Sequence, residues 1–166
     1  IERKLEITRK LLEVFIKFRH PFCIISINAQ VARDIDLLDK LASQNLVQVI
    51  LSITTLDDSL RRILEPRTTS VQSKLSVIQK LTAAGIPVSV MNAPIIPSIN
   101  HCEIPQIIEA VARSGALAVG YTTVRLNGKI GSLFEGWLET YFPDRKEKVI
   151  NQIKELHGGK VNDSEF

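Results

Sequence analysis

Long apolar runs are absent from this sequence. No stretch approaches the roughly 20 residues of a membrane-spanning helix, and no charged start followed by an apolar segment marks a secretory signal. The two cysteines, Cys23 and Cys102, lack the spacing of metal ligands, so we expect no metal site formed by this chain alone. Free thiols suit a reducing compartment, and we therefore expect a soluble, cytoplasmic protein.

Several common catalytic and phosphate-binding motifs are also absent. No GxGxxG or GxxxxGK occurs, which excludes the usual backbone cradles for dinucleotides and nucleoside triphosphates. The three histidines lie near predicted helix ends, where a capping or solvent-facing role is more common than a catalytic one: His20, His101 and His157. The 21 basic and 18 acidic residues give a net charge of +3, which is too weak a bias to indicate a nucleic-acid partner by itself.

The chain does contain enough apolar material for one domain. Of its 166 residues, 45% are apolar and 23% are charged, which is typical of a globular protein with a buried core. The first residue is Ile1 rather than Met, and residues 2–7 already have the pattern of a helix with no capping residue before it. We therefore expect a piece of a longer protein, with an incomplete barrel domain at residues 1–157 and a flexible tail at 158–166.

Strands and helices are predicted to alternate along the chain. Strands are expected at residues 22–27, 46–54, 87–92 and 117–124, and their continuous apolar character indicates burial on both faces. Helices are expected at residues 2–20, 31–42, 58–64, 69–85, 100–115, 133–141 and 143–156. Such alternation specifies right-handed crossovers and a parallel sheet. Four strands cannot close an eight-stranded barrel, so the sequence predicts an α/β fold, either a small open sheet or four strands of a larger, TIM-like barrel with C-terminal helices.

The sequence also predicts local details of these helices. The first helix carries an apolar stripe expected to face the core: Leu5, Leu11, Leu12, Phe15 and Phe18. Two helix starts have the pattern of a capping pair, namely Thr69 with Gln72 and Asn100 with Glu103. Helix starts and exposed faces are the expected places of five carboxylates: Asp34, Asp36, Asp39, Asp57 and Asp58.

Neutral polar residues follow each predicted strand. In parallel α/β folds, ligands bind beyond the carboxyl ends of the strands. The residues at these ends are Ser26, Asn28 and Gln30; Ser52, Thr54 and Thr55; Asn92; and Tyr121, Thr123 and Arg125. They suit a ribose, an adenine edge or an amino-acid head group, and they include no nucleophile paired with a base. We therefore expect one ligand-binding rim, although any single residue could instead only cap the helix that follows it.

Five segments carry a family resemblance in the same order along the chain. They are residues 52–57 (SITTLD), 64–70 (LEPRTTS), 84–97 (AGIPVSVMNAPIIP), 120–126 (GYTTVRL) and 134–145 (FEGWLETYFPDR). On these segments the chain resembles radical SAM proteins related to spore photoproduct lyase, over nearly its whole length. The Glu-Pro-Arg, Ala-Pro and Phe-Pro-Asp-Arg sequences together make the resemblance fairly specific.

The resemblance implies a partial barrel of six βα units that binds a 4Fe-4S cluster and S-adenosylmethionine, whose one-electron cleavage yields a 5′-deoxyadenosyl radical. In such families a CxxxCxxC loop after the first strand holds three irons of the cluster. This chain lacks that loop and would supply the third to sixth strands, so the isolated chain is expected to be inactive. For the full-length enzyme the kinship suggests a lyase that repairs DNA, while the substrate itself is not predicted.

The resemblance also assigns residues to the cofactor. It places Ser52 against the methionine or ribose portion, and Ala93 with the backbone near Tyr121 beside the adenine. The strand ends add three further candidate cofactor-binding residues: Asn28, Thr54 and Asn92. Where the relatives tend to have Thr-Lys-Ser, this chain has Ser26-Ile27-Asn28, so an aliphatic side chain replaces the family lysine. Either Arg67 or Arg125 supplies the missing charge, or this branch binds its cofactor differently or is degenerate.

Two other functions stay open from the sequence. One is a non-redox barrel lyase acting on a small metabolite, which would need an acid–base pair or a phosphate-binding loop that the strand ends lack. The other is a scaffold or binding module without a cluster. An apolar face is also expected to be exposed where the missing N-terminal units should pack, and it would favour self-association of the isolated chain.

Overall fold

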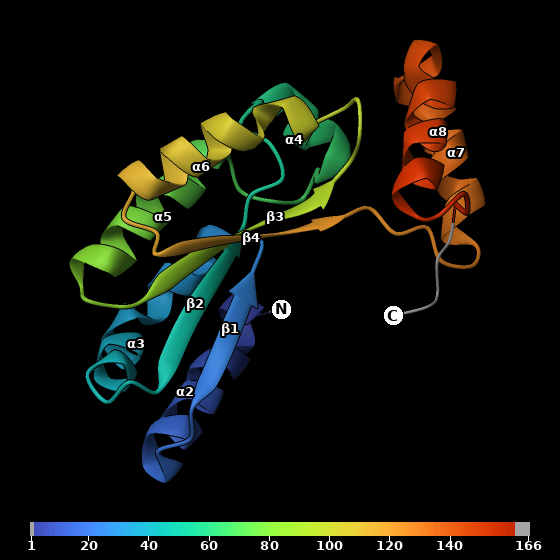
Figure 1. Cartoon of the computed structure of the whole chain (residues 1–166). Helices are drawn as coiled ribbons and strands as arrows, with labels where there is room; N and C mark the ends of the chain where they lie inside the picture. The colour runs from blue at the N-terminus through green and yellow to red at the C-terminus, as the bar shows by residue number, and fades with distance from the viewer. Residues whose placement is uncertain (1, 162–166) are drawn as a thin grey trace.

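The computed structural model describes residues 2–161. Figure 1 shows one four-stranded sheet in which the strands follow chain order and every neighbouring pair is parallel. The strands are β1 (Phe22–Ser26), β2 (Val47–Ser52), β3 (Val88–Ile95) and β4 (Ala118–Thr123). The predicted α/β fold, a partial TIM-like barrel of parallel βα repeats, is therefore confirmed.

Helices precede β1, occupy every crossover between strands and follow β4. They are α1 (Glu2–Leu5), α2 (Ile7–Phe18), α3 (Ile35–Ala42), α4 (Asp58–Leu64), α5 (Val71–Ala83), α6 (Ile104–Arg113), α7 (Ile130–Tyr141) and α8 (Lys146–Leu156), with short 3-10 turns η1 (Ala29–Asp34), η2 (His101–Glu103) and η3 (Pro143–Arg145). Because strands in chain order with crossovers of one hand put their helices on one side, the helices of residues 2–161 leave the other face of the sheet bare, and Cys23, Ile25 and Gln48 on that face are exposed. None of the helices in residues 2–161 has both the length and the apolar character needed to cross a bilayer.

The main core lies between the sheet and these crossover helices. Val49 and Leu51 of β2 and Val88 of β3 are fully buried in it, together with Leu38, Ile78 and other residues of the helices. A second cluster joins α7 and α8 to the loop after β3, through Ile96, Leu138 and Ile153. The division into a domain at residues 1–157 and a tail at 158–166 stays a prediction, and residues 162–166 lie outside the described residues.

β1 departs from the prediction that each strand is covered on both faces. Its residues alternate between half-buried and exposed, and Ile25 keeps 66% of its surface in contact with solvent. Phe22 and Ile24 face the core, whereas Cys23 and Ile25 lie on the face without helices. The prediction was wrong for this strand because, among residues 2–161, the core packs against its Phe22 and Ile24 side and leaves the other side exposed. It was also wrong for β4, where Ala118, Tyr121 and Thr122 are exposed.

The first predicted helix is interrupted at Glu6. This residue has a left-handed backbone with φ of 52°, so α1 and α2 are separate helices. Of the predicted stripe, Leu12 is buried and Phe15 partly buried, whereas Leu5, Leu11 and Phe18 are exposed. The stripe was predicted wrongly because α2 has two apolar sides, and only the side with Leu12 packs on the core.

Both predicted capping pairs are also replaced by other contacts. Ser70, rather than Thr69, caps α5 by accepting a hydrogen bond from the Ser73 amide. The Thr69 hydroxyl instead accepts one from the Ala29 amide at 3.1 Å, which ties the loop before α5 to the turn after β1. Neither Asn100 nor Glu103 makes a side-chain cap at the start of α6. In both places a side chain expected to cap the helix instead forms a hydrogen bond with a residue distant in the sequence.

The predicted surface carboxylates include one that is buried. Asp34 lies at the start of α3, as expected, but it is enclosed by ion pairs with Arg33 at 2.7 Å and Arg9 at 3.2 Å. Asp36 is exposed, and its hydrogen bond with Arg9 lowers its pKa to about 2. Asp57 caps α4 through the Ser59 amide, as predicted.

Candidate functional site at the carboxyl ends of the strands

Ser52 is the last residue of β2, at the edge of the sheet where parallel folds bind ligands. It is in register with Met91 of β3, so both side chains point to the face without helices. The Ser52 hydroxyl donates a hydrogen bond to the Ala93 carbonyl at 3.2 Å. The structure thus brings together Ser52 and Ala93, two of the residues assigned to the cofactor.

Asn92 and Tyr121 are register partners that point to the opposite, helix-covered face. Asn92 is buried and donates from Nδ2 to the Ile53 carbonyl at 2.8 Å. The Tyr121 ring is 71% exposed and lines a cavity of about 450 Å³ with Ile95 and Ile104. The expectation of a single rim was therefore wrong for these two side chains, because adjacent strand residues alternate between the faces. Tyr121 can therefore contact a ligand next to Ser52 only through its backbone.

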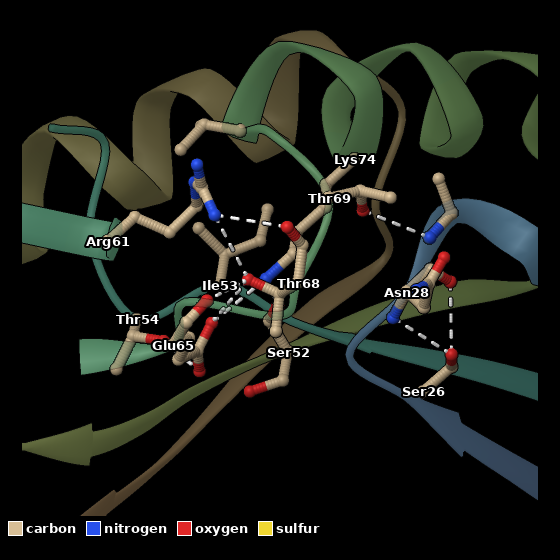
Figure 2. Close-up of polar contacts among 12 residues, drawn as sticks. Ser26, Asn28, Ser52, Ile53, Thr54, Arg61, Glu65, Thr68, Thr69 and Lys74 are labelled. Carbon is tan, nitrogen blue, oxygen red and sulfur yellow. Dashed lines mark hydrogen bonds and ion pairs between the residues drawn. The ribbon is translucent and has the colours of Figure 1, made fainter. Parts of the chain in front are cut away.

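Thr54 points into a buried polar cluster behind β2 (Figure 2). Its hydroxyl donates to Glu65 Oε1, and the other oxygen of that carboxylate lies 3.2 Å from Lys74 Nζ. Lys74 Nζ also donates to the Ser52 carbonyl at 2.9 Å. Neither Glu65 nor Lys74 was predicted from the sequence as a residue of the site. The signal was available for Lys74, which follows Val71 by three residues on the inward side of α5, where an aliphatic residue is the norm.

The loop between α4 and α5 carries Arg67 and is held at several points. Arg61 donates from Nη1 to the Thr68 carbonyl at 3.0 Å and pairs with Asp58 at 2.8 Å. The hydrogen bond from Arg61, followed by one from the Val71 amide, lowers the pKa of Asp58. Arg67 itself is exposed. The loop therefore presents this guanidinium from a fixed backbone close to the turn after β1.

Asn28 caps the turn that follows β1, which was the alternative to a role in ligand binding. Its Oδ1 accepts from the Gln30 amide at 3.0 Å and so caps η1, while its own amide donates to the Ser26 hydroxyl at 3.0 Å. Figure 2 shows Ser26 and Asn28 in this turn, with Thr69 reaching toward it. Asn28 is only partly buried, so the amide group of its side chain remains near the rim.

Asn100 and Glu103 join the ends of β2 and β3 instead of capping a helix. Asn100 Nδ2 donates to the carbonyls of Thr54 at 2.9 Å and Pro94 at 3.0 Å, and its Oδ1 accepts from the Ile96 amide. Both carboxylate oxygens of Glu103 accept hydrogen bonds, at 2.7 Å each, from the Thr55 hydroxyl and the Leu56 amide. The Thr55 hydroxyl therefore also has its hydrogen-bond partner within the protein.

Arg125 lies after β4, beside a cavity of about 220 Å³. The walls of this cavity include Pro94 from the end of β3 and the ring of Trp137 from α7, which stacks on Phe134. Arg125 is exposed, like Arg67. The two cations thus come from different loops at the carboxyl side of the sheet.

The described residues offer no ligand set for a metal cluster. Across residues 2–161, no three His, Cys, Asp or Glu side chains come together as a metal site, and Cys23 and Cys102 are both exposed free thiols. An iron–sulfur cluster needs several thiolates at one place. Any such ligands would have to come from polypeptide other than the described part of the chain.

Comparison with known families and proteins gives one family match. The radical SAM superfamily matches residues 1–111. An uncharacterized protein of Mycobacterium tuberculosis is 28% identical over 139 residues, which cover 82% of this chain and 40% of that protein. An uncharacterized protein of Methanocaldococcus jannaschii is 26% identical over 152 residues, which cover 92% and 55%.

A third relative comes from a virus. An uncharacterized protein of the Acidianus two-tailed virus is 36% identical over 90 residues, which cover 54% of this chain and 29% of the viral protein. The chain therefore spans between 29% and 55% of the length of these three relatives. No solved structure matches the chain.

Proposed function

Because this chain belongs to the radical SAM superfamily, we propose that it forms the later βα units of an enzyme that binds S-adenosylmethionine at the carboxyl ends of its strands. Members of this superfamily normally combine that cofactor with a 4Fe-4S cluster. The observation that carries the proposal is the position of Ser52, whose side chain lies at the end of β2 on the helix-free face. Its contact with the Ala93 carbonyl brings the end of β3 to the same point.

The residues at this position fit the polar groups of S-adenosylmethionine. Ser52 supplies a hydroxyl, and the backbone of Ala93 and of residues near Tyr121 supplies the donors and acceptors that an adenine edge or a ribose requires. Gly120 lies beside Met91 on the same face, and the Met91 thioether lies 3.4 Å from where a Cβ at Gly120 would be. We also assign Thr54 and Asn92 to the cofactor site. Their side chains would support it indirectly, by holding the end of β2 in place through hydrogen bonds.

A cation is expected near the carboxylate of the cofactor, and we propose Arg67 for this role. Ile27, at the position of the family lysine, is exposed at the end of β1 and carries no charge. The loop with Arg67 is tied to the adjoining turn through Thr69 and the Ala29 amide. Arg125 approaches from the β4 side and is the second candidate. A guanidinium is well suited to a carboxylate because it offers paired donors in one plane.

The cluster ligands are proposed to lie in a CxxxCxxC loop outside this chain, since the described residues do not fit a cluster. When bound, S-adenosylmethionine supplies a 5′-deoxyadenosyl radical after one-electron reduction. Residues 1–166 alone are accordingly proposed to be inactive. A cytoplasmic lyase that repairs DNA is the proposal that the family resemblance favours for the whole protein.

The isolated chain is also proposed to self-associate through an exposed apolar side of α2. Ile7, Leu11, Val14 and Phe18 follow one another at helical spacing and are all exposed. Such a side is unfavourable in water and favours contact with another apolar surface. Light scattering on dilute samples tests this, and a clean monomer would contradict it.

Titration calorimetry of the complete gene product with S-adenosylmethionine tests the proposed cofactor site. Ser52→Ala should weaken binding about tenfold, which corresponds to the loss of one hydrogen bond. Ser43→Ala is the matched control, because Ser43 is an exposed serine whose hydroxyl bonds only its own helix, to the Lys40 carbonyl. Equal affinity of the Ser52 variant and the natural protein would contradict the assignment. Formation of 5′-deoxyadenosine by the reconstituted protein tests the activity separately.

A further inference from the structure

Three successive backbone carbonyls at the end of β2 each accept a hydrogen bond from a buried side chain of a different element. Lys74 of α5 donates to the Ser52 carbonyl at 2.9 Å, Asn92 of β3 to that of Ile53 at 2.8 Å, and Asn100, just before η2, to that of Thr54 at 2.9 Å. The three donors are only 1%, 3% and 2% exposed. The backbone of residues 52–54 is thus fixed from three directions.

Lys74 is the costliest of the three donors to bury. An ammonium group out of water requires a counter-charge and full hydrogen bonding, and an aliphatic side chain of similar size would be at least as compatible with the core. Glu65 supplies the counter-charge, and its second oxygen also holds the Thr54 hydroxyl (Figure 2). A general need for stability therefore does not account for a lysine at this position. Its contact with the Ser52 carbonyl does.

We infer that Lys74, Asn92 and Asn100 are positioning residues, which hold residues 52–54 in the geometry that presents Ser52 to the ligand. The inference rests on the proposed binding of S-adenosylmethionine at Ser52. Asn92 then acts through the backbone of β2 rather than by touching the cofactor, because its side chain lies on the helix-covered face. A fixed backbone binds more tightly because less conformational entropy is lost when the ligand arrives.

Two substitutions at Lys74 separate the donated hydrogen bond from the charge. Lys74→Gln is neutral but still able to donate to the Ser52 carbonyl, whereas Lys74→Met is neutral and unable to donate. Loss of one hydrogen bond corresponds to about a tenfold change, and we expect Lys74→Met to weaken the binding of S-adenosylmethionine by this factor. Lys74→Gln should keep an affinity close to that of the natural protein. Asn100→Asp, which loses the donor to Thr54, should behave like Lys74→Met.

Ile78→Val, one turn along α5, is the matched control for general destabilisation. Ile78 is fully buried in the main core and, being aliphatic, donates no hydrogen bond to the carbonyls of residues 52–54, so its variant should lose stability without losing affinity. Hydrogen exchange of residues 52–57 gives a second readout that needs no ligand. Exchange there should be faster in Lys74→Met than in Ile78→Val, while residues 22–26 of β1 should exchange alike in both.

The two readouts distinguish failure of the inference from failure of the proposed function. Unchanged affinity and unchanged exchange in Lys74→Met would overturn the positioning role. If the natural protein binds no S-adenosylmethionine, the proposed function fails, and exchange alone decides the inference. Faster exchange in Lys74→Met than in Ile78→Val would then still support a held strand end, and equal exchange would overturn it.

Discussion

β1 and β2 are neighbouring parallel strands in direct register, yet their carboxyl ends are built differently. The end of β2 is buried, and side chains from α5, β3 and the segment before η2 bind its carbonyls. The end of β1 is held by the local turn of Ser26 and Asn28 and by one hydrogen bond with Thr69. Of the two ends, only that of β2 is bound by a fully buried charged group, Lys74, whose counter-charge Glu65 is partly buried.

The position of each strand in the sheet accounts for this difference. β2 lies between two strands and beneath α5, so its terminal carbonyls are out of water and must find partners within the protein. β1 has one neighbour among the described residues, and water reaches its exposed side. The terminal carbonyls of β2 therefore require polar partners within the protein, whereas water can serve as the partner at the end of β1. Three sets of substitutions test how far this contrast extends.

Replacing Glu65 should have the largest effect on stability. Glu65→Leu leaves the ammonium of Lys74 buried without its counter-charge, and such a loss typically lowers the free energy of unfolding by about 3 to 5 kcal/mol. Urea denaturation followed by circular dichroism measures it. Glu109→Leu is the control, because Glu109 and Arg113 form an exposed pair whose loss costs about 1 kcal/mol or less. Similar losses in the two variants would mean that water reaches Lys74.

Truncation of an aliphatic side chain should have the next largest effect on stability, and this effect should differ between β2 and β1. Leu51→Ala on β2 empties a fully buried position and should lower the free energy of unfolding by about 2 to 5 kcal/mol. Ile25→Ala on β1 changes an exposed side chain, and its effect should stay within about 0.5 kcal/mol. Thermal and urea unfolding of both variants give the comparison. A large loss for Ile25→Ala would show that its side of β1 is covered in solution.

The turn after β1 should contribute least. Asn28→Ala removes the cap of η1 and should cost about 1 kcal/mol, the usual value for loss of a side-chain cap. Asn28→Ser, which restores an accepting oxygen, should recover most of that loss in the same unfolding measurement. If serine gave no recovery, the amide group would have a contact beyond the cap.

The sequence predicted the order of elements because each strand is a short apolar run and each helix has its own periodicity. It also identified Ser52 correctly as a residue at the end of a strand. It could not predict the partners of that end, because Lys74, Asn92 and Asn100 lie 22, 39 and 46 residues from the carbonyls that they bind. Asn100 and Glu103 were assigned to a helix cap for the same reason. Local patterns do not reveal which residues a fold brings together over such separations.

The exposure of β1 was mispredicted for a related reason. Phe22 to Ile27 reads as a strand buried on both faces, since its composition is apolar throughout. Whether the second face is covered depends on neighbours that the run itself does not encode. The two apolar sides of α2 present the same ambiguity, and the structure resolves it in favour of the side with Leu12.

The one-sided arrangement of the crossover helices has a consequence for how this protein can change over generations. Substitutions at Val49 or Leu51 disturb packing with several helices at once, so they are constrained by folding. Cys23, Ile25 and Gln48 lie on the other face and are exposed, so a change there disturbs few neighbours. Away from the proposed ligand position at Ser52, the helix-free surface of the sheet can thus diversify, while the helix-covered surface preserves the scaffold.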